Sequence, residues 1–68
     1  MKVNGKDISL SELSIPSVDG LLGHLQLHRD RVAVEINGKI IRKKNLDEIM
    51  LTNDDTIEII HFVGGGSF

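Results

Sequence analysis

The C-terminal sequence HFVGGGSF places Gly64, Gly65 and Gly66 directly after an apolar run, with Ser67 and Phe68 behind them. Glycine lacks a Cβ atom, so a stretch of glycines can pass close to other surfaces and enter narrow channels. Glycine-rich stretches are also typical of flexible linkers. The tail is therefore either a flexible end, a leftover linker or the functional part of the molecule.

Side chains offer little other chemistry. The chain has no cysteine, so disulfides and thiolate ligands are excluded, and it has three histidines. His24 and His28 have the spacing of a two-histidine metal site on a helix, but no third ligand accompanies them. We therefore expect surface histidines and no metal site, with His61 partly buried because it alternates with apolar residues. No nucleophile–base pair is evident, which argues against an independent enzyme.

Composition indicates one small globular domain. The 68 residues are 40% hydrophobic and 26% charged, and the formal net charge is −2. Nucleic-acid-binding proteins usually have a basic face and aromatic stacking residues, whereas this chain has no Trp or Tyr. No apolar run approaches the length of a membrane span. We expect a cytoplasmic protein, in keeping with the absence of cysteine, that binds neither nucleic acid nor membranes.

Two Asn-Gly pairs, Asn4-Gly5 and Asn37-Gly38, predict hairpins, because two-residue turns of this type favour positive φ at both positions. The first turn would join Lys2-Val3 to a strand at residues 6–10. The second lies inside the alternating apolar stretch at residues 32–41, which is the strongest local signal in the sequence.

A change of period at residues 17–28 predicts the main helix. Its apolar residues recur at the spacing of one helix face: Val18, Leu21, Leu22 and Leu25. Ser17 is a suitable N-cap, and we expect the helix to end near Leu27-His28. Gly20 and Gly23 are unfavourable here, each by about 1 kcal/mol relative to alanine, so the helix should be short.

The last strand is predicted at residues 56–63, after a loop with one helical turn around residues 46–49. Strand alternation places Ile57 and Ile59 on one face of this strand, with Glu58, Ile60 and Phe62 on the other.

The resulting order is strand, strand, helix, strand, strand, turn of helix, strand, which defines an α+β protein. It predicts a ubiquitin-like β-grasp fold, a mixed sheet of about five strands with one main helix packed across one face. We expect residues 1–63 to form this domain and residues 64–68 to form a flexible glycine-rich tail.

The sequence resembles the small sulfur-carrier proteins of thiamine biosynthesis over essentially its whole length. The resemblance is carried by VNGK near the start, SVDGLLGHLQL in the helix, VAVEINGKII in the central hairpin and DDTIEIIHFVGGG at the end. The last segment is the most specific, because a β-grasp domain whose final strand runs into Gly-Gly is the mark of ubiquitin-like carriers.

This resemblance implies that the chain is a cosubstrate and not an enzyme. A ubiquitin-activating-like adenylyltransferase would use ATP to adenylate the carboxylate of Gly66, and the carrier itself would bind no cofactor. A persulfide from a sulfur donor, a cysteine desulfurase or another persulfide enzyme, would displace AMP and leave a thiocarboxylate. Thiazole synthase would then take the sulfur for thiazole formation. We expect a monomer, since the tail must be presented freely.

The carrier must also present a docking surface to these partners. Alternation groups apolar residues on the open face of the sheet: Ala33, Ile60 and Phe62, with Ile40 or Ile41. Glu58, Lys39 and Arg42 would form its polar rim. Apolar residues grouped on an uncovered face often mark an interface, so we expect the partners to bind there.

The resembled family ends at its last glycine, whereas Ser67 and Phe68 follow here. Three explanations fit: a remnant of an expression vector, a natural extension removed by a protease, or a relative that has lost the activity. Other functions also stay open at this point. They are a carrier of another pathway (the small subunit of molybdopterin synthase, or a cysteine or methionine synthesis carrier with a cleavable extension), a plain β-grasp interaction module, and protein conjugation.

Overall fold

The computed structural model describes residues 1–62, so the predictions that fall on residues 63–68, including the flexible tail, lie outside the described residues. The elements follow the predicted order, with short 3₁₀ helices in the connections. Their bounds are β1 Lys2–Val3, β2 Lys6–Asp7, η1 Leu10–Glu12, α1 Val18–His24, η2 Arg29–Arg31, β3 Val32–Ile36, β4 Lys39–Ile41, η3 Lys43–Asn45 and β5 Thr56–His61.

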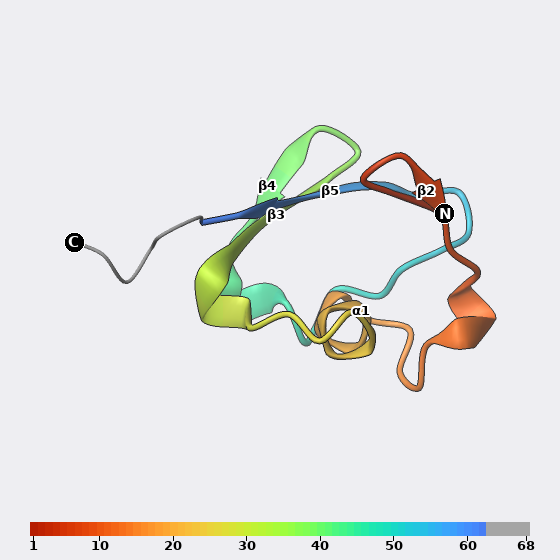
Figure 1. Ribbon diagram of the computed structural model, residues 1–68, viewed down its shortest axis with the longest axis horizontal. Coiled ribbons are helices and arrows are strands. Elements are labelled where there is room, and N and C mark those ends of the chain that lie inside the picture. Colours follow the sequence, from red (N-terminus) through yellow and green to blue (C-terminus); the bar gives the residue numbers. More distant parts are fainter. Residues whose placement is uncertain (63–68) are drawn as a thin grey trace.

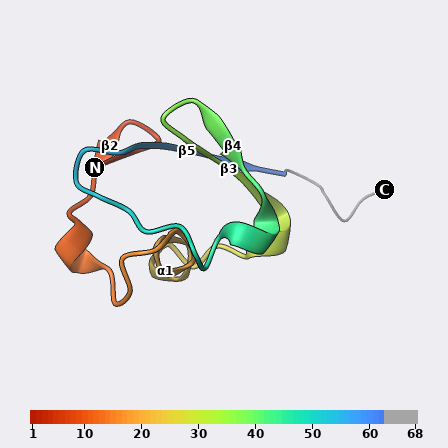
Figure 2. The same ribbon diagram turned by 180° about the vertical axis from the view of Figure 1, so that it is seen from behind.

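The strands form one five-stranded mixed sheet in the order β2-β1-β5-β3-β4. β1 runs parallel to β5, and the other neighbouring pairs are antiparallel. Figure 1 shows α1 below the sheet, with the opposite face left open by the described segments. The view from behind shows the same two layers (Figure 2). The predicted α+β architecture, one helix packed across a mixed sheet, is confirmed.

Both Asn-Gly turns have the predicted geometry. Asn4 and Gly5 have φ angles of 51° and 84°, and Asn37 and Gly38 have φ angles of 51° and 86°. Positive φ at both central positions gives these turns the twist of the strands that they join. The two hairpins therefore follow directly from local sequence.

The second strand is shorter than predicted, because it ends at Asp7 and not at Leu10. Ser9 caps η1 and its own amide donates to the Glu12 side chain at 2.8 Å, which completes a capping box. The Ser-x-x-Glu signal of this box is present in the sequence, and it turns the chain out of the sheet.

The helix begins as predicted and ends earlier. The Ser17 side chain accepts a hydrogen bond from the Gly20 amide at 3.0 Å, which caps the first turn. At the other end Gln26 adopts a positive φ of 59°, and the Leu27 amide donates to the Leu22 carbonyl at 2.9 Å. This is a Schellman closure, so α1 stops at His24 and the predicted end near Leu27-His28 is wrong.

The two helix glycines differ in their surroundings. An added Cβ at Gly20 would overlap the carbonyl oxygen of Ile15, whereas one at Gly23 would meet nothing within 4 Å. Glycine at position 20 therefore lets the chain before the helix lie against it, and only Gly23 is a local weakness of the helix.

The core lies between α1 and the covered face of the sheet. Its most deeply buried side chains come from the helix, the sheet and the loop before β5: Leu21, Leu22, Leu46, Ile57, Val18 and Val34. Burying each such side chain stabilises the fold by roughly 1.5–3 kcal/mol. None of the helices in residues 1–62 has the length and apolar character needed to cross a membrane.

The predicted helical turn around residues 46–49 is present, because the amide of Ile49 donates to the Asn45 carbonyl at 3.1 Å, and a 3₁₀ turn precedes it. The 3₁₀ turn occupies Lys43–Asn45, and Leu46 follows it as an anchor that is 2% exposed. The amide of Asp19 donates to the Leu46 carbonyl at 3.0 Å, so contact with the helix fixes this loop.

Candidate functional site

The structure fixes the point from which the glycine tail continues. β5 ends at His61, which pairs with Val32, and the amide of Phe62 donates to the carbonyl oxygen of Arg31 at 2.9 Å. The predicted reactive residues Gly64, Gly65 and Gly66 lie outside the described residues, so their role stays a prediction. β5 is a central strand with β1 on one side and β3 on the other, and it leads to this point.

Two asparagine side chains hold β5 in addition to forming turns. Asn4 lies just past β1, where its side chain accepts from the amide of Ile59 at 2.7 Å and donates to the carbonyl of Ile59 at 3.2 Å. On the other flank, the Asn37 side chain accepts from the amide of Thr56 at 2.9 Å. The sequence predicts these asparagines only as turn residues, because their second contact depends on a strand far along the chain. Both contacts fix the position of β5.

The predicted apolar docking residues do lie together on the open face. Ala33 pairs with Ile60 across β3 and β5, and Phe62 follows two positions after Ile60. Ile40, Ile60 and Phe62 are 64%, 51% and 48% exposed, whereas Ile41 packs against the core. We call this surface the sheet patch, defined as Ala33, Ile40, Ile60 and Phe62 with the carboxylates Glu35 and Glu58. Its role in docking stays a prediction.

Glu35 is the member of the sheet patch that sequence reasoning missed. The strand register places it opposite both Glu58 on β5 and Ile40 on β4. Like charges directly opposite each other are destabilising in a sheet. Alternation within residues 32–36 could have placed Glu35 on the open face, but only the register shows that two carboxylates meet there. The sheet patch therefore combines apolar side chains with an acidic pair.

The histidines do not form a site. His24, His28 and His61 are all exposed, so the prediction that His61 is partly buried is wrong. His61 lies at the last position of β5, where the sheet ends and α1 no longer covers it. Residues 1–62 contain no group of three or more His, Asp or Glu side chains that could hold a metal ion.

The sequence and the structure were both compared with known proteins. A sequence model of the ThiS family matches residues 1–66. The chain is 41% identical over 66 residues to the sulfur carrier protein ThiS of Bacillus subtilis, which covers 97% of this chain and 98% of that protein. The crystal structure of the thiamine biosynthesis protein ThiS from Geobacter metallireducens matches with a TM-score of 0.75 and 30% identity, covering 96% of each chain.

A further match is to a much longer protein. The thiazole synthase of Paramagnetospirillum magneticum is 35% identical over 65 residues, which cover 96% of this chain and 19% of that protein. The matches confirm both the β-grasp fold and the predicted sulfur carrier of thiamine biosynthesis, and they do not support a carrier of another pathway. This chain belongs to the ThiS family of small sulfur carrier proteins.

Proposed function

We propose that this chain carries sulfur for thiazole formation as a thiocarboxylate on Gly66. The observation that carries the proposal is the match to the ThiS family, which spans residues 1–66 and so includes the last glycine of the tail. Ser67 and Phe68 follow that glycine, and we infer that their removal frees its carboxylate. The chain then acts as a cosubstrate, with its folded domain recognised by other proteins and its tail reacting in their sites.

The chemistry proceeds in balanced steps on the glycine carbonyl. A carboxylate oxygen of Gly66 attacks the α-phosphorus of ATP in a ubiquitin-activating-like adenylyltransferase, and pyrophosphate leaves. The terminal sulfur of a donor's persulfide attacks the acyl carbon and displaces AMP. A thiol then reduces the sulfur–sulfur bond, which leaves the thiocarboxylate on the carrier and a disulfide on the thiol side. The thiocarboxylate sulfur is the nucleophile for thiazole formation.

The glycines suit this chemistry for a physical reason. A backbone without Cβ atoms passes close to the walls of a narrow site. Gly64, Gly65 and Gly66 together provide a bare segment that can enter the sites of two different partners. A side chain at Gly65 or Gly66 should therefore impair transfer far more than folding.

Thiazole synthase is the proposed acceptor of the sulfur. In the thiazole synthase of Paramagnetospirillum magneticum, a segment similar to 96% of this chain makes up 19% of the protein. A carrier-like segment within the same chain as a synthase supports a partnership between the two activities.

The sheet patch is the proposed docking surface for the adenylyltransferase and thiazole synthase. It is open, apolar and adjacent to the end of β5, from which the tail continues toward a partner's site. Its acidic pair, Glu35 and Glu58, suits a cationic side chain on the partner, because two opposed carboxylates are relieved by a positive charge between them.

The proposal is tested by incubating two forms of the chain with ATP and the adenylyltransferase from the same cells. The form that ends at Gly66 should release pyrophosphate and gain AMP in its intact mass. The form that retains Ser67-Phe68 is the matched control, and it should do neither because its terminal carboxylate is not on glycine. Equal reaction of both forms, or reaction of neither, would contradict the proposal.

A further inference from the structure

Positive charge is concentrated in two short segments of the chain. Arg29–Arg31 and Arg42–Lys44 hold five of the eight Lys and Arg residues and one carboxylate, Asp30, for a net charge of +4. The whole chain carries −2, so all the other residues together carry −6. We call the five cations of these segments the basic collar: Arg29, Arg31, Arg42, Lys43 and Lys44.

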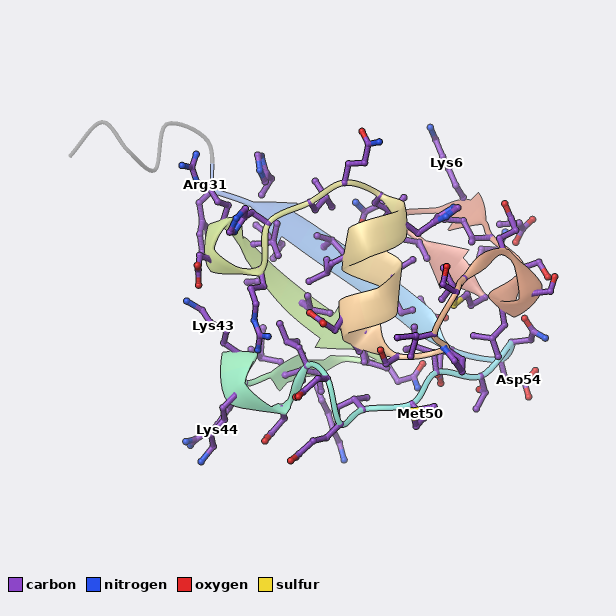
Figure 3. The ribbon with its side chains drawn as sticks, turned by 90° about the horizontal axis from the view of Figure 1, so that it is seen from below. Lys6, Arg31, Lys43, Lys44, Met50 and Asp54 are labelled. Atoms are coloured by element: carbon purple, nitrogen blue, oxygen red, sulfur yellow. The ribbon has the colours of Figure 1, made fainter. Side chains whose placement is uncertain are left out.

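The fold brings the basic collar to the end of the domain at which β5 finishes. The carbonyl oxygen of Arg31 accepts the hydrogen bond from the Phe62 amide, directly after β5. Arg42 follows Ile41, which pairs with Val34 at the middle of β3, and β4 runs antiparallel to β3 toward the end that pairs with His61. Figure 3 shows Arg31, Lys43 and Lys44 at this end, whereas Lys6 lies at the opposite end. The cations therefore lie at the end of the domain from which the tail continues, with Arg31 next to the end of β5.

Contacts between the two segments hold the collar in place. Arg29 Nη2 donates to the carbonyl oxygen of Lys43 at 2.6 Å, and Lys43 Nζ lies 2.9 Å from Asp30 Oδ1. The hydrogen bond and charge of Lys43 hold the pKa of the Asp30 carboxyl below its ordinary value. Asp19 Oδ1 lies 3.8 Å from Arg29 Nη1, and this ion pair links the collar to α1. The segments are thus fixed relative to each other before any partner arrives.

The outward cations of the collar have no acidic partner within the domain. Arg31, Arg42 and Lys44 form no ion pair within 4.0 Å with any carboxylate of residues 1–62. All three residues are exposed. They are therefore available for charge pairing with another molecule.

The position of the collar identifies the kind of molecule. Gly66 lies four residues beyond Phe62 in the sequence, and an extended chain advances roughly 3.3–3.6 Å per residue, or about 13–14 Å in all. When the tail extends fully into a narrow site, a nucleotide phosphate joined to Gly66 lies up to that distance beyond the end of β5. The collar would instead meet the protein surface around the entrance of that site. Cations around an entrance fit a rim of Asp and Glu side chains.

We propose that the basic collar docks on an acidic rim around the active-site entrance of the adenylyltransferase that receives the tail. The inference rests on the proposed function, since it assumes that the tail enters a partner's site. The charge asymmetry of the carrier orients it during encounter, with its positive end toward the acidic entrance, and so accelerates productive association.

The test compares two double variants with the same change in net charge. Arg31→Glu/Lys44→Glu reverses two outward collar residues, and Lys2→Glu/Lys6→Glu reverses two cations on β1 and β2. Each is prepared in the form ending at Gly66, and pyrophosphate release with the adenylyltransferase is measured over a range of salt concentrations. Circular dichroism and urea unfolding establish that both variants remain folded.

At low salt the collar variant should lose roughly 100-fold in kcat/KM, mostly through the KM for the carrier, and the loss should shrink as salt rises. The control variant should stay close to wild type. Equal losses in both variants would indicate a general charge effect and would overturn the inference, as would an unchanged collar variant. A change confined to the KM for ATP would indicate a nucleotide contact and would also overturn it. Failure of the wild type to react would count against the proposed function instead.

Discussion

The two faces of β5 carry apolar residues for different reasons. On the covered face Ile57 is 0% exposed and Ile59 is 8% exposed, beneath α1. On the open face of the same strand, Ile60 and Phe62 are 51% and 48% exposed. Apolar residues stabilise a fold only in so far as folding removes them from water, so the open-face residues contribute less to folding. The comparison indicates that one face serves stability and that the other is left open for the proposed docking.

A matched pair of alanine variants should separate the two faces most clearly. Ile57→Ala should lower the free energy of unfolding by about 2–5 kcal/mol, because it leaves a cavity beneath the helix. Ile60→Ala removes the same side chain from the open face and should change this free energy by about 0.5 kcal/mol or less. Urea denaturation followed by circular dichroism measures both. Similar losses in the two variants would contradict the division into a stabilising face and a docking face.

Substitutions on the open face should weaken binding to partners even where they barely change the free energy of unfolding. Phe62→Ala should weaken binding to the adenylyltransferase by about 2 kcal/mol, or roughly 30-fold in Kd, because a large aromatic side chain leaves the sheet patch. Met50→Ala is the control, since Met50 is also an exposed apolar residue, at 58%, but lies outside the patch. Isothermal titration calorimetry measures both. Unchanged binding by Phe62→Ala would rule out the sheet patch as the docking surface.

The helix that covers the other face gives a second matched pair. Gly20→Ala should destabilise the domain by about 1–3 kcal/mol, because the new methyl group overlaps the backbone of Ile15. Gly23→Ala meets nothing within 4 Å and should stabilise it by up to about 1 kcal/mol through helix propensity. The midpoint of urea unfolding should fall for Gly20→Ala and rise for Gly23→Ala. Midpoint shifts of the same sign in both variants would show that the close approach of Ile15 is not the reason for glycine at position 20.

A smaller effect on stability is expected from Asp55, which directly precedes β5. The backbone amide of Thr52 donates to its carboxylate at 2.8 Å, and this hydrogen bond holds the pKa of Asp55 below its ordinary value of 3.8. The Asn37 side chain also donates to it, at 3.0 Å. The folded state thus binds protons less readily than the unfolded state. The resulting stability is present above pH 3.8 and is lost as the pH falls through the folded-state pKa.

Unfolding measured between neutral pH and pH 3 would test this effect. Asp55→Asn should be less stable than wild type at neutral pH and should lose less stability on acidification. Asp54→Asn is the control at the neighbouring position, and it should keep the acid sensitivity of wild type. An Asp55→Asn variant with undiminished acid sensitivity would show that another carboxylate is responsible.

Most features set by local sequence were predicted well, with the capping box at Ser9 as an exception. Asn-Gly specifies both turns without reference to the rest of the chain, and Ser17 marks the start of the helix. Alternation along β5 correctly separates Ile57 from Ile60. These features depend on backbone preference and on the period of apolar residues, both of which can be read from a few neighbouring residues.

Features that depend on distant contacts were missed. Glu35 lies opposite Glu58 because of the register of two strands that are far apart in the sequence. The need for glycine at position 20 comes from the three-dimensional path of the chain at Ile15, which local patterns do not specify either. Asn4 reaches β5 through its side chain, which no local pattern indicates. The chemistry of the tail was inferred from a family resemblance, because glycines carry no side chain that would identify a reaction.

The proposed function requires that the active chain ends at Gly66 and that this residue carries sulfur. The most direct measurement is the intact mass of the protein isolated from the cells that make it, with and without a thiol-alkylating reagent. We expect a chain ending at Gly66 in which part of the population has sulfur in place of one terminal oxygen and takes up one alkyl group. A population that always retains Ser67-Phe68 and never reacts with the reagent would contradict it.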